Sequence, residues 1–470
     1  MLLPLFIILP LIVGIFMLLM NNQKPQKWFG AVVSSILVGL FFYLTCGQKE
    51  MSYQIDWFSF NGIKTFFALD GTGLGGLMLL LANLVYAGLF IYIGSSDQKY
   101  SNSFYGLLLI ALAGLNGVFL AQDLILFYFF WEIVLIPIYF LIGVWGKGEE
   151  KIQANMTFFL YTIFGSMFML AGIIYIGFNL KPISFLLSDV QQVTTEYFST
   201  NTFLGLLFLI AFVIKIPIFP FHTWQPTAYK TSPTPVTVVL SALMAKMGLF
   251  AIVQWFLGLF PAISELFDYF LYIAVFGLIY ASLIALSTTN IKKIVAYSSI
   301  AHLALIFVAL FTRNEIGTEG AYFQMFSHGL VVLGLWLIVD VLEREYKVTD
   351  INSIKGLATV NPTLAILFMV FALANMALPL TSSFIGEFMM LNALFIYNPV
   401  LAVFACLGVI LSAVYTLRLG GAILFGEVTN IDLNYRSKDT SGVTIIIALV
   451  ALLVIFLGIY PTPVFEIIAR

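Results

Sequence analysis

The chain has 470 residues and a net charge of −2, and 61% of its residues are hydrophobic but only 9% are charged. Soluble domains are about half apolar and about a quarter charged, so this composition excludes a soluble protein and indicates a chain buried in lipid. The charge gives no basic surface for nucleic acid, and the widely separated Cys46 and Cys406 exclude an iron–sulfur cluster held by this chain alone, because such clusters need about four thiolates.

Fourteen apolar stretches are long enough for transmembrane helices, since a helix needs about 20 residues to cross the hydrocarbon. Short connections join them, so we predict an all-α polytopic membrane protein with a single membrane domain over residues 1–470. The first stretch is expected to be a retained helix, because it has neither a basic leader nor a cleavage site. The predicted helices span 2–20, 28–46, 72–94, 103–121, 123–145, 153–178, 201–219, 234–258, 266–287, 293–311, 319–340, 362–397 with a break, 399–425 and 443–460.

Loop charges predict the orientation of these helices, because Lys and Arg accumulate in cytoplasmic loops. Connections after odd-numbered helices contain thirteen Lys and Arg, and connections after even-numbered helices contain four. We therefore expect both termini on the outer, periplasmic side of a bacterial inner membrane. The thirteen are Lys24, Lys27, Lys99, Lys147, Lys151, Lys230, Lys292, Lys293, Arg344, Lys347, Lys355, Arg436 and Lys438, and the four are Lys49, Lys64, Lys181 and Arg313.

Ionisable residues within the predicted helices indicate a function, because each costs about 2.5–3.5 kcal/mol on insertion scales. Glu132 lies among aromatic residues in 123–145. Lys215 lies in 201–219, two residues before Pro217, and a proline break at membrane depth is tolerated where the freed polar groups line a cavity. Burial disfavours the charged ammonium. We interpret Lys215 as a proton carrier tuned by Glu132; the alternatives are a neutral structural acid and a lysine that reaches the membrane surface.

Further ionisable residues lie at similar depth in later helices: Lys246, His302, His328 and Glu387. Two histidines on consecutive helices, beside serine and glutamine, favour a proton relay over separate structural roles. A bis-histidine haem site is disfavoured, because neither helix carries a spaced histidine pair. Arg418, in a later helix, is expected to pair with a carboxylate or to reach the cytoplasmic edge.

A second break at Pro379, before Glu387, repeats the pattern of the first. The two breaks occupy comparable places in two predicted five-helix units, 103–258 and 264–425, with helices over 1–102 before them and a last helix over 443–460. Five is an odd number, so the second unit is expected to be inverted. Inverted repeats with broken helices are typical of ion-transport folds, and we predict a path for protons or similar cations along the buried row.

Four segments, FWEIVLIPIYFLIGVWG, KIPIFPFHTWQPTAY, AYSSIAHLALI and FIGEF, occur in an order and spacing that resemble the antiporter-like, proton-pumping subunits of respiratory complex I, the NADH–quinone oxidoreductase. The resemblance covers nearly the whole chain. It is closest to the M type, which is subunit 4 in mitochondria, because the chain ends after the fourteenth helix and carries Glu387 where other types carry lysine. The resemblance implies proton transfer by Glu132, Lys215, Lys246, His302, His328 and Glu387.

The resemblance also implies that no cofactor, metal or redox centre is held in this chain, and that flavin, iron–sulfur clusters and quinone belong to other subunits. L-type and N-type subunits and the lipid bilayer are the expected partners. Residues 225–232, QPTAYKTS, depart from the LPDAH motif of the family, which leaves the role of this segment in proton entry open. The polar segment 343–357 is interpreted as a docking surface or a solvated connector.

Three other functions fit the same buried row. The first is a subunit of an Mrp-type sodium–proton antiporter, and the second is a membrane subunit of a proton-pumping hydrogenase or ferredoxin-linked complex. The third is a membrane scaffold in which the buried charges serve only helix packing. The scaffold is the least favoured, because several buried charges without a function would be costly.

Overall fold

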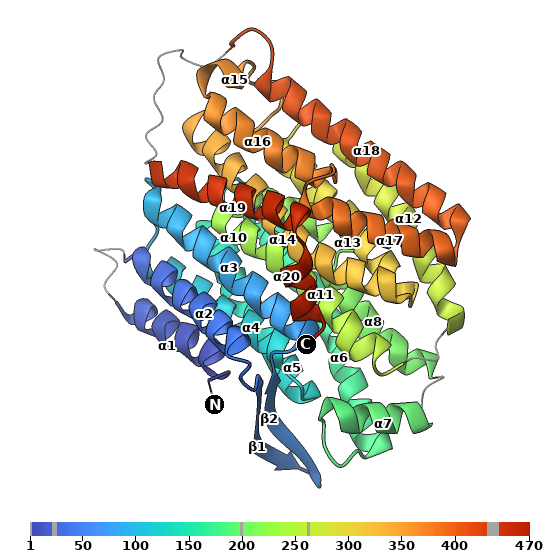
Figure 1. Cartoon of the computed structure of the whole chain (residues 1–470). Helices are drawn as coiled ribbons and strands as arrows, with labels where there is room; N and C mark the ends of the chain where they lie inside the picture. Colours follow the sequence, from blue (N-terminus) through green and yellow to red (C-terminus); the bar gives the residue numbers. More distant parts are fainter. Residues whose placement is uncertain (1, 21–25, 198–200, 261–263, 430–440) are drawn as a thin grey trace.

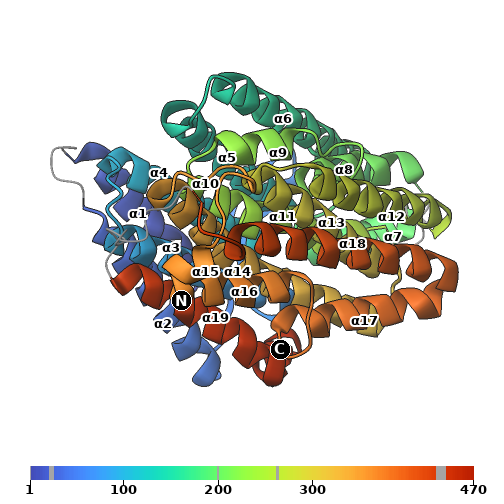
Figure 2. The same ribbon diagram turned by 90° about the horizontal axis from the view of Figure 1, so that it is seen from above.

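The computed structural model describes residues 2–20, 26–197, 201–260, 264–429 and 441–470. Lys24, Arg436 and Lys438 of the loop-charge count lie outside the described residues. Long helices pack side by side (Figures 1 and 2), and a β-hairpin projects at one end of the bundle (Figure 1). Within the described ranges, eleven helices are long and apolar enough to cross a membrane, and four shorter apolar helices accompany them.

The elements follow the predicted stretches closely. Polar caps set several helix starts, as at Asp123, whose carboxylate accepts the N–H groups of Ile125 and Leu126 at the start of α5. The first half of the chain contains α1 (Leu5–Leu19), α2 (Trp28–Cys46), β1 (Ser52–Phe60), β2 (Ile63–Asp70), α3 (Gly73–Ser95), α4 (Asn102–Leu120), α5 (Leu124–Trp145), α6 (Lys151–Tyr175), η1 (Ile176–Leu180), α7 (Leu187–Tyr197), α8 (Thr202–Lys215), α9 (Trp224–Thr231), α10 (Thr234–Val239), η2 (Leu240–Met244), α11 (Ala245–Ala251) and η3 (Ile252–Leu257), where η denotes a π-helix.

The second half is helical throughout its described elements. Asn361 caps α16 by accepting the N–H of Leu364, and Asn398 caps α18 in the same way. The elements are α12 (Ser264–Ser287), α13 (Ile291–Phe311), α14 (Glu315–Glu345), α15 (Leu357–Val360), α16 (Pro362–Asn375), α17 (Ser382–Tyr397), α18 (Pro399–Leu424), α19 (Ser441–Ile459) and α20 (Thr462–Ile468).

The connection between α2 and α3 forms a β-hairpin, so the all-α prediction is wrong at this segment. Phe60 pairs with Ile63, which leaves Asn61 and Gly62 as a two-residue turn with φ values of 48° and 83°. Two positive φ values match a type I′ turn, for which Asn-Gly is the preferred pair. The signal was therefore present in the sequence, since Asn61-Gly62 separates two segments rich in aromatic and β-branched residues.

Both predicted helix breaks are present. α8 ends at Lys215, and an irregular segment over 216–223 leads into α9. α16 ends at Asn375, and a second irregular segment over 376–381 precedes α17. The stretch over 234–257 is one span in which α-helical and π-helical turns alternate, and Lys246 lies just after the π-helix η2.

The connections gather on two opposite faces. On the first, which we call the hairpin face, β-bridges join Leu69 to Ala121 and Asp123 to Leu186. The guanidinium of Arg470 donates to the carbonyl of Thr45 at 2.7 Å, so the C-terminus also lies on this face, near the hairpin (Figure 1).

On the second face, which we call the lysine-rich face, Lys27 donates to the carbonyl of Ser96 at 3.0 Å, and a bridge joins Asn290 to Asp350. Gln98 also contacts Asp340 near the end of α14, and the N–H of Lys147 donates to the carbonyl of Thr231, so the described connections after α3, α5, α9, α12 and α14 lie on this face.

Candidate functional site

Lys246 is fully buried at the centre of the bundle. Its ammonium donates to the carbonyl of Ser241 on η2 at 2.7 Å and lies 2.8 Å from Nδ1 of His328 on α14. π-Helical turns occur frequently at functional sites, and here one presents a carbonyl to the side chain of a lysine. Lys246 is therefore fixed between an acceptor that cannot take its proton and an imidazole that can.

His328 extends the contact toward the second half of the chain. Its ring lies 5.4 Å, centroid to centroid, from the ring of His302 on α13. Its Nε2 atom is buried and has no hydrogen-bond partner among the described residues. One nitrogen of His328 thus faces Lys246 while the other is free to release or receive a proton.

His302 connects the two histidines to Glu387 on α17. Its Nδ1 lies 2.8 Å from the carbonyl of Ser298, and its Nε2 lies 3.2 Å from Oε1 of Glu387. A carbonyl only accepts, so Nδ1 carries a hydrogen, and the proton between Nε2 and the carboxyl belongs to one or the other. Gln324 also donates to Oε1 of Glu387 at 3.3 Å. His302 and Glu387 therefore form a buried pair that shares a proton.

A network of hydrogen bonds supports the pair of His302 and Glu387 through Ser298. Asn375, the last residue of α16, donates to Oγ of Ser298 at 3.0 Å and to Thr416 at 3.2 Å, and Tyr415 donates to Ser298 at 2.9 Å. The freed end of the broken helix is thus held by polar partners. The sequence analysis did not select Asn375 or Tyr415, and the one signal was an asparagine at membrane depth beside a predicted break.

Glu132 and Lys215 are arranged differently. Lys215 is 2% exposed, and its ammonium lies 5.3 Å from the centroid of the Trp131 ring, a cation–π contact. Glu132 is near enough for its charge to act on Lys215, but among the described ion pairs, which extend to 4.0 Å, none joins these two residues. Oε1 of Glu132 is buried without a hydrogen-bond partner.

Lys215 has a further source of stabilisation in the end of its own helix. It is the last residue of α8, where the carbonyl ends of the backbone favour a cation. The hydrogen bonds of the described residues do not link Lys215 to Lys246, although α8 and α11 pack closely: a Cβ at Gly248 would lie 3.0 Å from the carbonyl oxygen of Phe212. The two lysines belong to neighbouring helices but not to one direct chain of contacts.

Other candidates lie outside the row. Arg418 donates to the carbonyl of Leu286 at the lysine-rich face, which matches the expected edge position. Within 343–357, Ile351 and Ile354 are buried against the bundle, which favours a packed connector over a docking surface. The described part of the chain contains no group of three or more His, Cys, Asp or Glu side chains that could hold a metal ion.

Comparisons with known proteins agree with this arrangement. The family described as NADH:quinone oxidoreductase/Mrp antiporter, TM, matches residues 121–414. NADH-quinone oxidoreductase subunit M of Rickettsia prowazekii is 35% identical and is aligned over 98% of this chain and 96% of its own length. NADH-ubiquinone oxidoreductase chain 4 of Marchantia polymorpha is 34% identical, over 97% of this chain and 93% of its own.

A solved structure of respiratory complex I from Thermus thermophilus with bound NADH contains a chain that is 27% identical, with a TM-score of 0.86, over 98% of this chain and 96% of that chain. The names of these relatives confirm the resemblance to the M type that the four sequence segments carry. The chain belongs to the NADH:quinone oxidoreductase/Mrp antiporter membrane family.

Proposed function

We propose that this chain is the M-type, proton-translocating subunit in the membrane arm of an NADH–quinone oxidoreductase, and that quinone reduction in other subunits drives it. The observation that carries this proposal is the chain of close contacts from Lys246 through His328 and His302 to Glu387. Four ionisable side chains at membrane depth, aligned in this way, are costly unless they transfer charge.

The residues in contact from Lys246 to Glu387, which we call the connected half of the row, work as a proton relay. When Lys246 gives its proton to Nδ1 of His328, the imidazole can release the hydrogen of its Nε2 toward His302, because a histidine ring binds and releases protons at opposite atoms. Nδ1 of His302 already carries the hydrogen donated to Ser298, so His302 takes up this proton at Nε2 once Glu387 has released its own, and Nε2 then passes it to the carboxylate 3.2 Å away. Each step moves one proton and returns the imidazole to neutral.

The other half of the row, Glu132 and Lys215, works by electrostatic interaction between two charges that form no ion pair. At an effective dielectric of about 20, two unit charges at about 4 Å, the limit for an ion pair, interact by about 4 kcal/mol, and a separation about twice as large reduces this to about 2 kcal/mol. That energy changes the protonation equilibrium of a lysine roughly 30-fold, since about 1.36 kcal/mol corresponds to a factor of ten. Neutralising or displacing Glu132 would therefore favour release of the Lys215 proton toward Lys246.

The same proposal includes a topology. Fourteen crossings result if α1, α8 and the pair α16–α17 are added to the eleven long helices. The units 103–258 and 264–425, each with one broken helix, form inverted repeats. The separation of connections onto two faces supports this count, and the lysine-rich face is assigned to the cytoplasm of a bacterial cell, with both termini outside. L-type and N-type subunits are the proposed lateral neighbours, and the redox cofactors are placed in other subunits.

Replacement of Lys215 tests the proposal. Lys215→Met, made in the intact complex and reconstituted in lipid vesicles, is expected to abolish NADH-driven acidification while the complex still assembles. Lys49→Met is the matched control, because its side chain is exposed on the hairpin face, away from the row. A normal proton-to-electron ratio in the Lys215 variant would refute the proposal.

The family description also names Mrp antiporters, so sodium–proton exchange is the second candidate. Acidification in sodium-free medium, driven by NADH, supports the oxidoreductase. Transport that requires sodium and no electron donor, from a preparation without flavin subunits, would favour the antiporter.

A further inference from the structure

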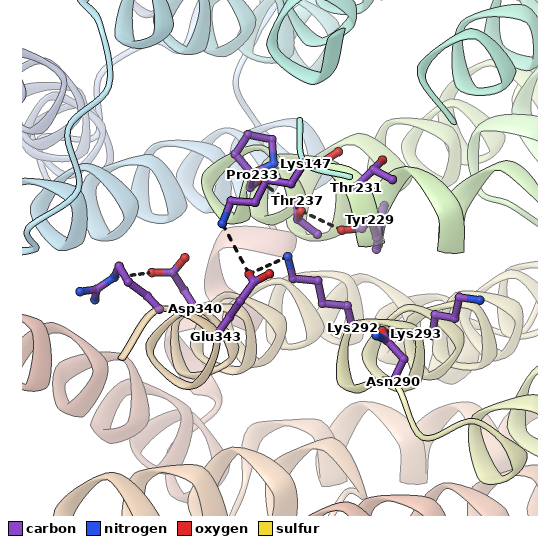
Figure 3. Close-up of polar contacts among 12 residues, drawn as sticks. Lys147, Tyr229, Thr231, Pro233, Thr237, Asn290, Lys292, Lys293, Asp340 and Glu343 are labelled. Carbon is purple, nitrogen blue, oxygen red and sulfur yellow. Dashed lines mark hydrogen bonds and ion pairs between the residues drawn. The ribbon is translucent and has the colours of Figure 1, made fainter. Parts of the chain in front are cut away.

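A pocket of about 410 Å³ with several charged residues in its walls opens at the lysine-rich face, between the ends of α9, α13 and α14. Lys292 and Lys147 converge on the carboxylate of Glu343 at one wall, at 2.8 Å and 4.0 Å (Figure 3). Thr231, the last residue of α9, lines the same pocket. Charged and hydroxyl-bearing walls of this kind admit water.

On the N-terminal side of Thr231, α9 carries buried polar groups that lack hydrogen-bond partners. Gln225 and Tyr229 are fully buried, and neither the amide atoms of Gln225 nor the hydroxyl of Tyr229 has a hydrogen bond among the described residues. The ring of Tyr229 lies edge-on to Trp336 of α14 at 5.9 Å, and the indole nitrogen of Trp336 also lacks a partner. Buried polar atoms are rarely unpaired, so a cluster of them indicates bound water.

This cluster points toward the relay. The hydroxyl of Tyr229 lies within reach of the side chains of Gln225 and Ser241, although its geometry does not satisfy a hydrogen bond to either. Ser241 in turn holds the ammonium of Lys246 through its carbonyl. Tyr229 therefore lies next to the residue that contacts Lys246.

Helix α14 runs along the same line. Glu343 lies fifteen residues after His328, which corresponds to about 22 Å along a helix. Trp336 lies between them, seven residues before Glu343 and on nearly the same face. The pocket at Glu343, the cluster at Tyr229 and the relay at His328 thus follow one side of α14.

We propose that water held by Gln225 and Tyr229 joins the pocket to Lys246, and that Tyr229 passes protons into the relay from the lysine-rich face. This inference rests on the proposed function. The phenol accepts a hydrogen from the water on the pocket side while its own hydrogen goes to the water beside Ser241, so the tyrosine gains no net charge. Residues 225–232 therefore supply proton entry through a hydroxyl and an amide, although they lack the histidine of the family motif.

Tyr229→Phe in the reconstituted complex tests this inference, because it removes only the hydroxyl. The rate of NADH-driven acidification is expected to fall roughly two- to tenfold, the range for one hydrogen bond in a transfer step, with assembly and thermal stability unchanged. Tyr229→His is expected to restore most of the rate, because an imidazole also donates and accepts. Tyr105→Phe is the control, since its buried hydroxyl accepts the N–H of Tyr100 at 3.2 Å and has no hydrogen bond to the row among the described residues.

Wild-type acidification by the Tyr229→Phe variant would overturn the inference, as would an equal loss in the Tyr105→Phe variant or a Tyr229→His variant as slow as the phenylalanine variant. Lys246→Met, measured in parallel, distinguishes a failure of the proposed function from a failure of the entry path alone. If that variant pumps normally, the proposed function itself fails. If it does not pump while Tyr229→Phe does, only the entry path is wrong.

Discussion

The two halves of the buried row differ in how their charges meet. From Lys246 to Glu387, side chains from α11, α14, α13 and α17 lie in contact, and the longest step is the 5.4 Å between histidine rings. Glu132 and Lys215, on α5 and α8, act on each other without an ion pair, and no described contact joins them to Lys246. One half is a continuous relay, and the other is a pair of separated charges.

Because of this difference, the two halves of the row should tolerate different kinds of substitution. A relay depends on atomic positions, because hydrogen bonds weaken steeply with distance and angle. An electrostatic influence over a longer distance depends on the presence of charge and changes slowly with position. We therefore expect the pair Glu132 and Lys215 to be sensitive to the loss of charge. The contacts from Lys246 to Glu387 should instead be sensitive to geometry.

Among variants that keep both lysines of the row, Glu132→Gln should have the largest effect, because it removes the charge that acts on Lys215. Without about 2 kcal/mol of interaction at a dielectric of about 20, Lys215 binds its proton roughly 30-fold more weakly and is protonated less often, so acidification should slow by up to that factor. Glu132→Asp keeps the charge and should retain the rate to within about threefold. Acidification by reconstituted complex checks both variants. An aspartate variant as slow as the glutamine variant would mean that Glu132 acts by direct contact.

Glu387→Asp should have the next largest effect, although it also keeps the charge. Shortening the side chain breaks the 3.2 Å contact with Nε2 of His302. A hydrogen bond to a charged group contributes about 1.5 kcal/mol or more, so the same assay should show a roughly tenfold loss. Glu315→Asp, at the exposed start of α14, serves as the control. If the two aspartate variants in the row behave alike, the contrast between the halves is wrong.

The sequence was sufficient to select all six residues of the row, because an ionisable side chain within a long apolar stretch is rare and costly. It was also sufficient to place the helices and the breaks after Lys215 and Asn375, since proline leaves a clear signal. It did not reveal that Glu132 and Lys215 lack an ion pair, because side-chain separation across two helices depends on their packing and rotation.

The remaining parts escaped prediction for different reasons. Ser298, Asn375 and Tyr415 are uncharged and common in buried helices, so nothing marks them before the structure brings them together. The π-helix η2, which presents Ser241 to Lys246, depends on tertiary packing and has no motif. The hairpin did have a signal at Asn61-Gly62, but residues 47–71 were interpreted only as a connection between two predicted helices.

Asn375→Ala tests whether the relay needs its brace. The variant loses hydrogen bonds to Ser298 and Thr416 and leaves their hydroxyls without this partner. We expect about 1–2 kcal/mol lower stability and a lower thermal midpoint, together with an acidification rate reduced by about two- to fivefold. Thr157→Ala, which removes a hydroxyl bonded to its own helix on an exposed face, should change neither. Lower stability with an unchanged rate would show that His302 is held without the network.

The smallest effect is expected at the lysine-rich end of the connected half, where Asp350 ties the connection before α13 to the one after α14. The hydroxyl of Thr289 and the N–H of Asn352 hold the pKa of Asp350 below its usual value. A lowered folded pKa stabilises the protein fully above the unfolded value of about 3.9, and this stabilisation is lost as the pH falls through the folded value. Asp350→Asn should therefore lower the thermal midpoint slightly and equally from about pH 5 to about pH 8, and the difference should shrink below about pH 4. A difference that persists unchanged at low pH would show that the carboxylate charge does not hold these two connections together, and that the ends of α13 and α14 are fixed by their packing alone.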